Sequence, residues 1–533
     1  MHRVIRRSVT TMVIALPLFT INLSLSRTVC AQQGPEFIGS GAVPPGADAN
    51  QETQGKLADM KNYLAAGRRR YVLADSYIRW PLSENLEKYA SLNGDHIKDY
   101  VNEITSIAQQ SRSDGNQYWG RIVGTKYDLA TDQWLMAKLK AAGVQDVKRQ
   151  ELDVPPQWWG NSWAVTIGSG NEARKLESAF PFVNTPGTSK EGLDLEAVYV
   201  GLGRKADFAG RDVRGKAVVV FTIPSPGIRD NSAQWFGAVA RAEENHAAAV
   251  LVVFGLPGNF SAQTVQPHST ADAVPTFLLG QDDGIALMDM IDRALPGPAP
   301  RIHLRLDATM KLAGQKTGLV LGVLPGATDE TIYVMAPLDS FFTGAMDNAS
   351  GIGTLVALAE YYAKIPQAQR KRTIVFAGTP GHHDGDPGTA WMHDHKDTVF
   401  NKSALILNCA HMAQTQTYVH GPFLRYSNAV EAHRWVLHGS SRLEAIAIRA
   451  FADFGVTTFA VPDANGGGAL GRIYKDAPSM FAYDMGPFYH TTGDIPEYVP
   501  STGLEQLARA YAEIIDQVNT VEIKDLQEAA TKN

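Results

Sequence analysis

The chain has 533 residues, and at about 150 residues per domain this length predicts roughly two to four domains. Hydrophobic residues make up 44% and charged residues 20% of the chain, a composition that excludes a wholly disordered protein. The 49 basic and 55 acidic residues give a net charge of −6, which argues against binding to nucleic acid, and the two cysteines (Cys30 and Cys409) exclude a disulfide framework.

The N-terminus has the residue order of a secretory signal peptide. A basic stretch, HRVIRR, precedes an apolar stretch from about Val9 to Leu25, and small residues follow up to Ala31. The apolar stretch contains a proline and several hydroxyl and amide side chains, which makes it a poor membrane span. We therefore expect residues 1–31 to be removed on export. The mature protein is expected in the periplasm or outside the cell, without contact to a membrane.

The next part of the chain changes from a flexible to a helical pattern. Residues 32–80 begin rich in Gly, Pro, Gln and Ala and are expected to form a flexible lead-in. From about residue 82 to 145, apolar residues recur at spacings of three and four, which predicts helices, and Gly143 follows the last of them as a C-terminal glycine. Short strands are expected to follow. Residues 81–175 are therefore expected to form the first part of a larger domain.

Residues 176–311 have the pattern of a separate small α/β module. Four short β-type runs, AVYVGL, KAVVVFTI, AAVLVVFG and AVPTFLL, alternate with one predicted helix, Ala233 to His246. The segment from Phe208 to Phe221, the helix of small residues and the next apolar strand together resemble the protease-associated domain. This resemblance implies a module inserted into a secreted peptidase.

From residue 312 to 525, predicted strands alternate with helices. GLVLGVL, TIYVMAPL, RTIVFAG and SALILNCA read as strands, and residues 349–365 and 501–519 as amphipathic helices. This alternation predicts a doubly wound, mostly parallel sheet. Ligands of such sheets bind beyond the carboxyl ends of the strands.

Polar and titratable residues gather where these predicted strands end. Asp339 follows the second strand, the triple His382-His383-Asp384 follows the third, and His411 follows the fourth. Five of the fourteen histidines fall within residues 382–411, more than an even spread would give. A single histidine in a loop is usually a solvated residue, but this grouping favours a ligand cluster.

Two motifs resemble signatures of the co-catalytic zinc exopeptidases, a family that includes secreted aminopeptidases and glutamate carboxypeptidases. The segment GAMDNASG contains Asp347, and the segment YHTTGD contains His490. The resemblance spans roughly residues 90–520 and implies the phosphorylase/hydrolase-like α/β fold of that family. It also implies that Asp347 is the bridging metal ligand and that Asp339 orients a ligand.

The same resemblance shows that several reactive residues are replaced. The remaining ligands of the first zinc in the family align with Pro337 and with Ala410, next to His411, and neither Pro337 nor Ala410 binds metal. The acid–base residue and a ligand of the second zinc align with His382 and His383. The set Asp347, His383 and His490 therefore remains for a single divalent metal, most simply zinc, with iron as the other option. His411 and Asp384 are additional candidate ligands.

These residues predict an exported hydrolase that cleaves a peptide or small amide substrate at an atypical mononuclear site. The unperturbed pKa of histidine near 6.5 suits His382 for accepting a proton from water, with Asp339 as the second catalytic candidate. Two alternatives remain open at this point. The replaced ligands are also typical of a non-catalytic protein that binds peptides or small ligands, and two histidines with one carboxylate also suit Fe(II), lyase or cyclase chemistry.

Overall fold

The computed structural model describes a large part of the chain after its N-terminal segment. The predicted signal peptide, and the predicted lead-in as far as residue 78, lie outside the described residues. Within the described part, no helix is both long and apolar enough to cross a membrane. The described residues are 79–168, 173–222, 235–264, 273–311, 314–420, 423–459, 461–462, 468–484 and 486–527.

The first sheet has seven strands in the order β18-β19-β15-β12-β14-β11-β2. Its central strands β14, β12, β15 and β19 run parallel, and β12 and β15 are almost wholly buried, as expected for apolar runs covered on both faces. The strands are β2 (Gln145–Asp153), β11 (Lys316–Leu324), β12 (Thr331–Pro337), β14 (Thr373–Thr379), β15 (Ser403–Asn408), β18 (Arg434–His438) and β19 (Ser479–Tyr483).

The flanks of this sheet differ from the expected mostly parallel arrangement. The pairs β2–β11, β11–β14 and β18–β19 are antiparallel, so the sheet is mixed and only its centre is parallel. The connection from β11 to β12 spans residues 325–330, which is too short for the dozen or so residues of a parallel crossover. The fold class is therefore α/β with a mixed sheet.

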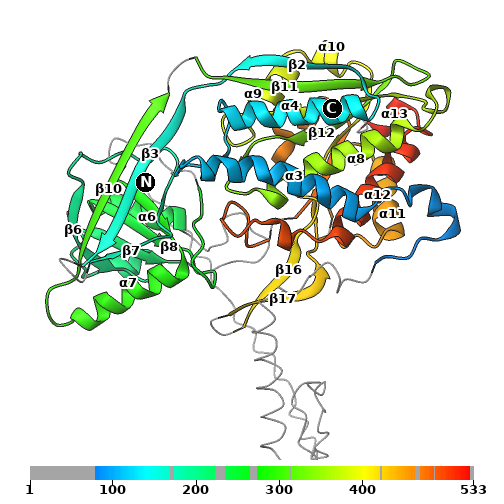
Figure 1. Ribbon diagram of the computed structural model, residues 1–533. Coiled ribbons are helices and arrows are strands. Elements are labelled where there is room, and N and C mark those ends of the chain that lie inside the picture. The colour runs from blue at the N-terminus through cyan, green and yellow to red at the C-terminus, as the bar shows by residue number, and fades with distance from the viewer. Residues whose placement is uncertain are drawn as a thin grey trace, which may run out of the picture. The chain divides into compact units, whose positions relative to one another are not determined.

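Helices cover the first sheet and are fixed at their ends by side chains. Asn93 caps α3 by accepting from the backbone N–H groups of Asp95 and His96, and Thr125 caps α4 in the same way. Contacts join α3 to α8 and α12, and α4 to β11, and Figure 1 shows α3, α4, α8 and α12 close to one another. The helices of this part are α3 (Gly94–Ser113), α4 (Lys126–Ala141), α8 (Gly351–Ala363), α9 (Pro387–Asp394), α10 (Lys396–Val399), α11 (Ser441–Asp453), α12 (Ser501–Val518) and α13 (Ile523–Leu526).

A second sheet of eight strands has the order β4-β3-β10-β6-β7-β8-β9-β5. Its four central parallel strands β6 to β9 match the four short runs seen in the sequence. It begins at β3, before the boundary at residue 176 expected from the sequence, because β3 pairs along its length with β10. The elements are β3 (Gln157–Ile167), β4 (Arg174–Lys175), β5 (Phe180–Pro181), β6 (Leu193–Tyr199), α5 (Lys205–Phe208), β7 (Ala217–Phe221), α6 (Trp235–Glu244), β8 (Ala249–Val253), β9 (Thr276–Leu279), α7 (Gln281–Ala294) and β10 (Arg301–Lys311).

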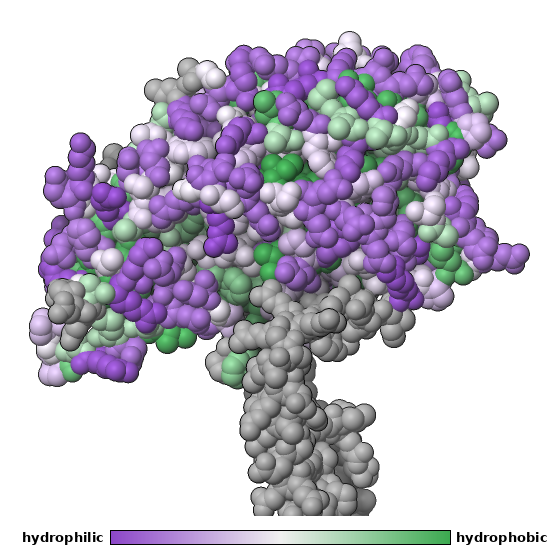
Figure 2. All heavy atoms as spheres, viewed as in Figure 1, coloured by the Kyte–Doolittle hydropathy of each residue, from purple (hydrophilic) through white to green (hydrophobic). Residues whose placement is uncertain are grey.

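Two short pairs of strands complete the fold. Strand β1 (Gly120–Arg121) pairs with β13 (Ser340–Phe341), and β16 (Thr415–His420) forms a hairpin with β17 (Phe423–Val430). The face seen in Figure 2 is mostly hydrophilic, with apolar residues in smaller groups between polar ones. Most of the large apolar side chains of the described residues are buried.

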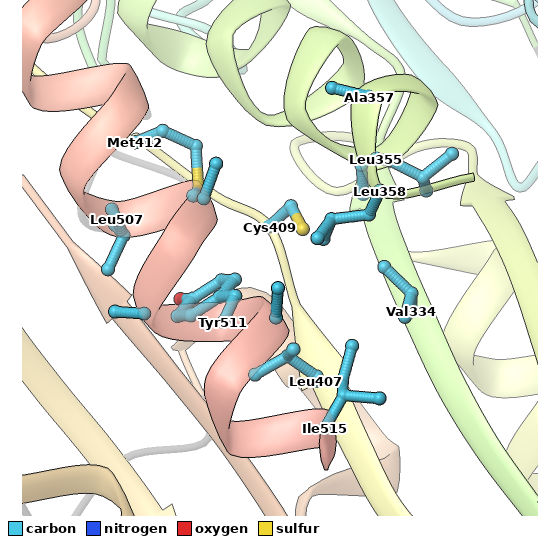
Figure 3. Close-up of a cluster of buried hydrophobic side chains, with 14 of the residues drawn as sticks. Val334, Leu355, Ala357, Leu358, Leu407, Cys409, Met412, Leu507, Tyr511 and Ile515 are labelled. Atoms are coloured by element: carbon cyan, nitrogen blue, oxygen red, sulfur yellow. The ribbon is translucent and has the colours of Figure 1, made fainter. Parts of the chain in front are cut away.

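The core next to the loops of the first sheet is built from β12, β15, α8 and α12. Figure 3 shows Leu407 and Cys409 of the β15 segment facing side chains of α8 and α12, and all of the labelled side chains are buried. The Tyr511 hydroxyl accepts from the Ala482 backbone N–H at 2.8 Å and lies 3.2 Å from the Asn408 carbonyl oxygen. This packing fixes the carboxyl end of β15.

Removing the Leu407 side chain tests this core. Leu407 is fully buried, so Leu407→Ala is expected to lower the free energy of unfolding by about 2–5 kcal/mol through lost burial and a residual cavity. Urea denaturation followed by circular dichroism measures the change. The matched control is Leu129→Ala, because Leu129 is 41% exposed and its loss is expected to cost about 0.5 kcal/mol or less. Equal effects of the two substitutions would contradict the packing described.

Helix α4 carries two buried carboxyl groups one turn apart. Asp128 accepts from the Gly124 N–H at 2.9 Å and the Thr317 hydroxyl at 2.8 Å, whereas Asp132 pairs with the Arg149 guanidinium at 2.7 Å. Burial, and then the charge of Asp132, raise the pKa of Asp128 to about 8. The Asp128 side chain is therefore protonated in the folded protein at neutral pH.

This raised pKa predicts a pH dependence of stability. Between about pH 4 and 8, Asp128 holds a proton when folded and loses it when unfolded, so its contribution to stability falls as pH rises, by at most about 1.4 kcal/mol per pH unit. Asp128→Asn is expected to remove this pH dependence. The free energy of unfolding of the variant, relative to that of the unchanged protein, is therefore expected to be higher at pH 8 than at pH 5. Urea unfolding at both pH values measures the difference, and parallel pH curves would refute the assignment.

Candidate functional site

The candidate site lies at the carboxyl edge of the parallel strands. Asp339 follows β12, His382 and His383 follow β14, and His411 follows β15. His490 lies in the loop after β19. Because the carboxyl ends of parallel strands meet at one edge of a sheet, these side chains converge although they are far apart in the sequence.

Three of the predicted metal ligands come together in one group. The carboxylate Oδ2 atom of Asp347 lies 3.3 Å from Nε2 of His383 and 3.1 Å from Nε2 of His490. One ligand atom from each residue lies within 4.8 Å of the other two. Two imidazoles and one carboxylate are a donor set that suits zinc or iron.

The charge of Asp347 is held by the imidazoles around it. Burial by itself raises the pKa of Asp347, but His411 and His383 outweigh burial and hold the pKa well below its usual range. Conversely, burial lowers the pKa of His383, and the charge of Asp347 outweighs it and raises that pKa. Asp347 is therefore an ionised carboxylate inside the protein.

The backbone around Asp347 is fixed by two neighbouring side chains. The carboxyl group of Asp494 accepts from the N–H groups of Met346 at 2.7 Å and of Asp347 at 3.0 Å. The Asn348 amide donates to the carbonyl oxygens of Pro337 and Cys409, at 3.0 and 3.1 Å. The turn that carries Asp347 is thus tied to the ends of both β12 and β15.

Asp339 holds the loop that carries the two adjacent histidines. Its two carboxylate oxygens accept from the backbone N–H groups of His382 at 2.9 Å and of His383 at 3.1 Å. Burial and then the neighbouring His383 lower the pKa of His382 to about 4, so its ring is neutral at physiological pH. Burial, together with Asp339, raises the pKa of Asp384 to about 7. Among the described residues, Asp384 is not part of the group of potential ligands.

The loop that carries His490 is held by residues from the connection between β8 and β9 of the second sheet. The Gln263 N–H donates to the His490 carbonyl oxygen at 2.9 Å, and Ala262 forms a β-bridge with Thr491. The ring of Phe341 lies against both His383 and His490, with centroid distances of 4.9 and 5.2 Å. Contacts from outside the first sheet therefore set the position of this histidine.

His411 lies on the other side of Asp347. Its Nε2 atom is 2.9 Å from Asp347 Oδ1, and its Nδ1 atom is 3.1 Å from the Asp484 carbonyl oxygen. An ionised carboxylate can only accept, so the N–H group of the His411 ring that faces Asp347 is on Nε2. The structure thus brings His411 to the site, but to a different oxygen from the one that faces His383 and His490.

A buried arginine beside the site is not indicated by any motif. The Arg121 guanidinium is fully buried and donates to the carbonyl oxygens of Leu338 at 3.1 Å, Thr343 at 3.2 Å and Gly344 at 3.4 Å. Burial lowers the pKa of Arg121 to about 10, and the charge of Asp347 opposes that change. This cation offsets part of the negative charge around the site. The structure is needed to recognise this role, because the partners of Arg121 are backbone carbonyl groups far away in the sequence.

Comparisons with known proteins show which family part of this chain resembles. Residues 320–433 match the model of Peptidase family M28. The aminopeptidase YwaD of Bacillus subtilis is 23% identical over 280 residues, which cover 51% of this chain and 53% of YwaD. The chain thus spans about half the length of the curated relatives that it matches. The resemblance of this part of the chain to the zinc exopeptidases is confirmed.

Two solved structures share the fold over most of the chain. A zinc aminopeptidase from Bacillus subtilis superposes with a TM-score of 0.59 and 17% identity, covering 82% of this chain and 98% of that one. A Peptidase M28 precursor from Shewanella amazonensis superposes with a TM-score of 0.62 and 16% identity, covering 84% of this chain and 100% of that one. These similarities establish the α/β fold.

Replacing Asp339 tests how the histidine loop is held. In Asp339→Asn, an amide NH₂ group faces one of the two N–H donors, so the loop shifts and zinc binding is expected to weaken about 10- to 100-fold. Competition with a chromogenic chelator measures the dissociation constant. Asp394→Asn on the exposed end of α9 is the control and is expected to bind zinc like the unchanged protein. Unchanged zinc affinity in Asp339→Asn would show that the loop does not depend on this carboxylate.

Proposed function

We propose that the chain is an exported, metal-dependent hydrolase that cleaves an amide or peptide bond at a mononuclear site. The observation that carries the proposal is the buried group of Asp347, His383 and His490, whose ligand atoms lie within 4.8 Å of one another. Zinc is the favoured ion, because the donor set suits it and because similar structures include a zinc aminopeptidase. The signal-like N-terminus supports export.

The ligand residues have a defined task in this proposal. Asp347, His383 and His490 would hold the ion, and with three protein ligands the ion could also bind water and substrate. A bound zinc ion supplies a Lewis acid and lowers the pKa of a coordinated water towards neutrality. The buried surroundings of the three side chains keep bulk water away from their charges.

Neighbouring residues prepare the proton transfer. The ring of His382, whose centroid lies 4.8 Å from that of His383, is the candidate acceptor for a proton from the attacking water. Its lowered pKa keeps the ring neutral but makes it a weaker base than the ordinary histidine expected from the sequence. Asp339 orients this ring indirectly, because it binds the backbone of His382 and His383. The second sheet, proposed as an inserted protease-associated module, supports His490 through its contacts with Gln263 and Ala262.

The substrate class follows from the relatives. The matched relatives and structures carry names of aminopeptidases and peptidases, so peptides or small amides are the proposed substrates. Nucleic acid is not a proposed substrate, because the net charge of −6 disfavours its binding.

Alanine substitutions of the ligands test this proposal. His383→Ala and His490→Ala are each expected to abolish retention of zinc through desalting, because only two protein ligands then remain. Inductively coupled plasma mass spectrometry measures the zinc content. His393→Ala is the control, because His393 lies on α9, its ring pairs with Asp476 and it is not part of this group, and the variant is expected to retain zinc. Equal retention in all three variants would refute the ligand assignment.

Hydrolysis by the zinc-loaded protein provides the second part of this test. A panel of aminoacyl 4-nitroanilides and dipeptides is expected to include a substrate whose hydrolysis is lost in His383→Ala. His382→Ala is expected to lower kcat about 10²- to 10⁴-fold while zinc is retained. Zinc binding without hydrolysis of any member of the panel would favour a ligand-binding protein instead.

A further inference from the structure

We infer that the imidazole of His411 takes the place of a second metal ion at Asp347 and thereby limits the site to one ion. This inference rests on the proposed function, and it deepens it by assigning a positioning role to a residue that is not a ligand. The two carboxylate oxygens of Asp347 have different neighbours. Oδ2 faces His383 and His490, whereas Oδ1 lies 2.9 Å from Nε2 of His411.

The N–H group of His411 uses the oxygen that a bridging carboxylate would offer to a second ion. A carboxylate bridges two ions by giving one oxygen to each, and Oδ1 of Asp347 already accepts from the imidazole. The hydrogen bond also fixes the plane of the carboxylate, so that Oδ2 is directed towards His383 and His490. His411 therefore orients a ligand without being part of the same ligand group.

Two residues at the strand ends next to the turn of Asp347 offer no ligand atom to a second ion. Pro337 and Ala410, at the ends of β12 and β15, have no ligand atoms in their side chains. The Cys409 thiol lies in the apolar core, and burial raises its pKa, which disfavours the thiolate that binds metal. Across the residues that the structure describes, the one group of three potential ligands is that of Asp347, His383 and His490.

His411 is held in position from several directions. Its backbone N–H donates to Asn348 Oδ1 at 3.0 Å, and its backbone carbonyl oxygen accepts from the Asp484 N–H at 2.9 Å. The ring nitrogen Nδ1 lies 3.1 Å from the Asp484 carbonyl oxygen. Its backbone has φ of +49°, a left-handed conformation that is costly for a residue with a Cβ atom. Such a conformation persists where the surroundings enforce it, and here it aims the ring at Asp347.

Zinc stoichiometry tests the inference. The double variant Pro337→His/His411→Asp puts potential ligands at the last residue of β12 and at the position that faces Oδ1, and it is expected to bind one more zinc per chain than the unchanged protein. The single variants Pro337→His and His411→Asp are the controls and are expected to bind no additional zinc. Inductively coupled plasma mass spectrometry after zinc loading and desalting gives the count. Equal zinc content in the double variant and the unchanged protein would overturn the inference.

A second measurement covers the case in which Pro337→His prevents folding. His411→Ala is expected to weaken zinc binding about 10- to 100-fold without changing its stoichiometry, and His411→Gln, which keeps an N–H donor, is expected to restore most of the affinity. Unchanged affinity in His411→Ala would overturn the positioning role. A loss of one of two zinc ions in His411→Ala would also overturn it, because His411 would then be a ligand itself.

These results separate the inference from the proposed function. An unchanged protein that binds no zinc contradicts the proposed function. The role of His411 is tested separately, by comparing the number of zinc ions bound per chain in the double variant and in the unchanged protein. One additional ion supports it, and no additional ion overturns it.

Discussion

The site depends on one buried negative charge, the carboxylate of Asp347, which three imidazoles surround. An ionised carboxylate is costly to bury unless opposite charges and hydrogen-bond donors accompany it. Here His383 and His490 face Oδ2, His411 faces Oδ1, and Asp494 fixes the backbone of the same turn. The ends of β12, β14, β15 and β19 supply these partners because the parallel centre of the sheet brings them to one edge.

The charge balance extends beyond the imidazoles. Arg121 lies fully buried near the negative charges of the site, and its guanidinium is held by three backbone carbonyl groups rather than by a carboxylate. It compensates charge without blocking the oxygens of Asp347. The contact between Gln263 and His490 adds a mechanical link, since the second sheet supports the loop of one candidate ligand.

Much of this arrangement is predictable from the sequence, because Asp347, His383 and His490 each follow a strand or lie in a motif that indicates the fold. The antiparallel flanks of the sheet are not predictable in this way. The sequences of β2 and β11 indicate strands but do not indicate whether these strands run parallel or antiparallel to their neighbours. The orientation of His411 depends on a left-handed backbone and on Asp484, far along the chain. Arg121 carries no motif signal, because its carbonyl partners belong to loops more than 200 residues away in sequence.

The most direct test of the central claim is an anomalous difference map at the zinc edge from crystals of the zinc-loaded protein. A single mononuclear site predicts one peak per chain, bounded by Asp347 Oδ2 and the Nε2 atoms of His383 and His490. A second peak between Asp347 Oδ1 and His411, or the absence of a peak beside Oδ2, would contradict the account.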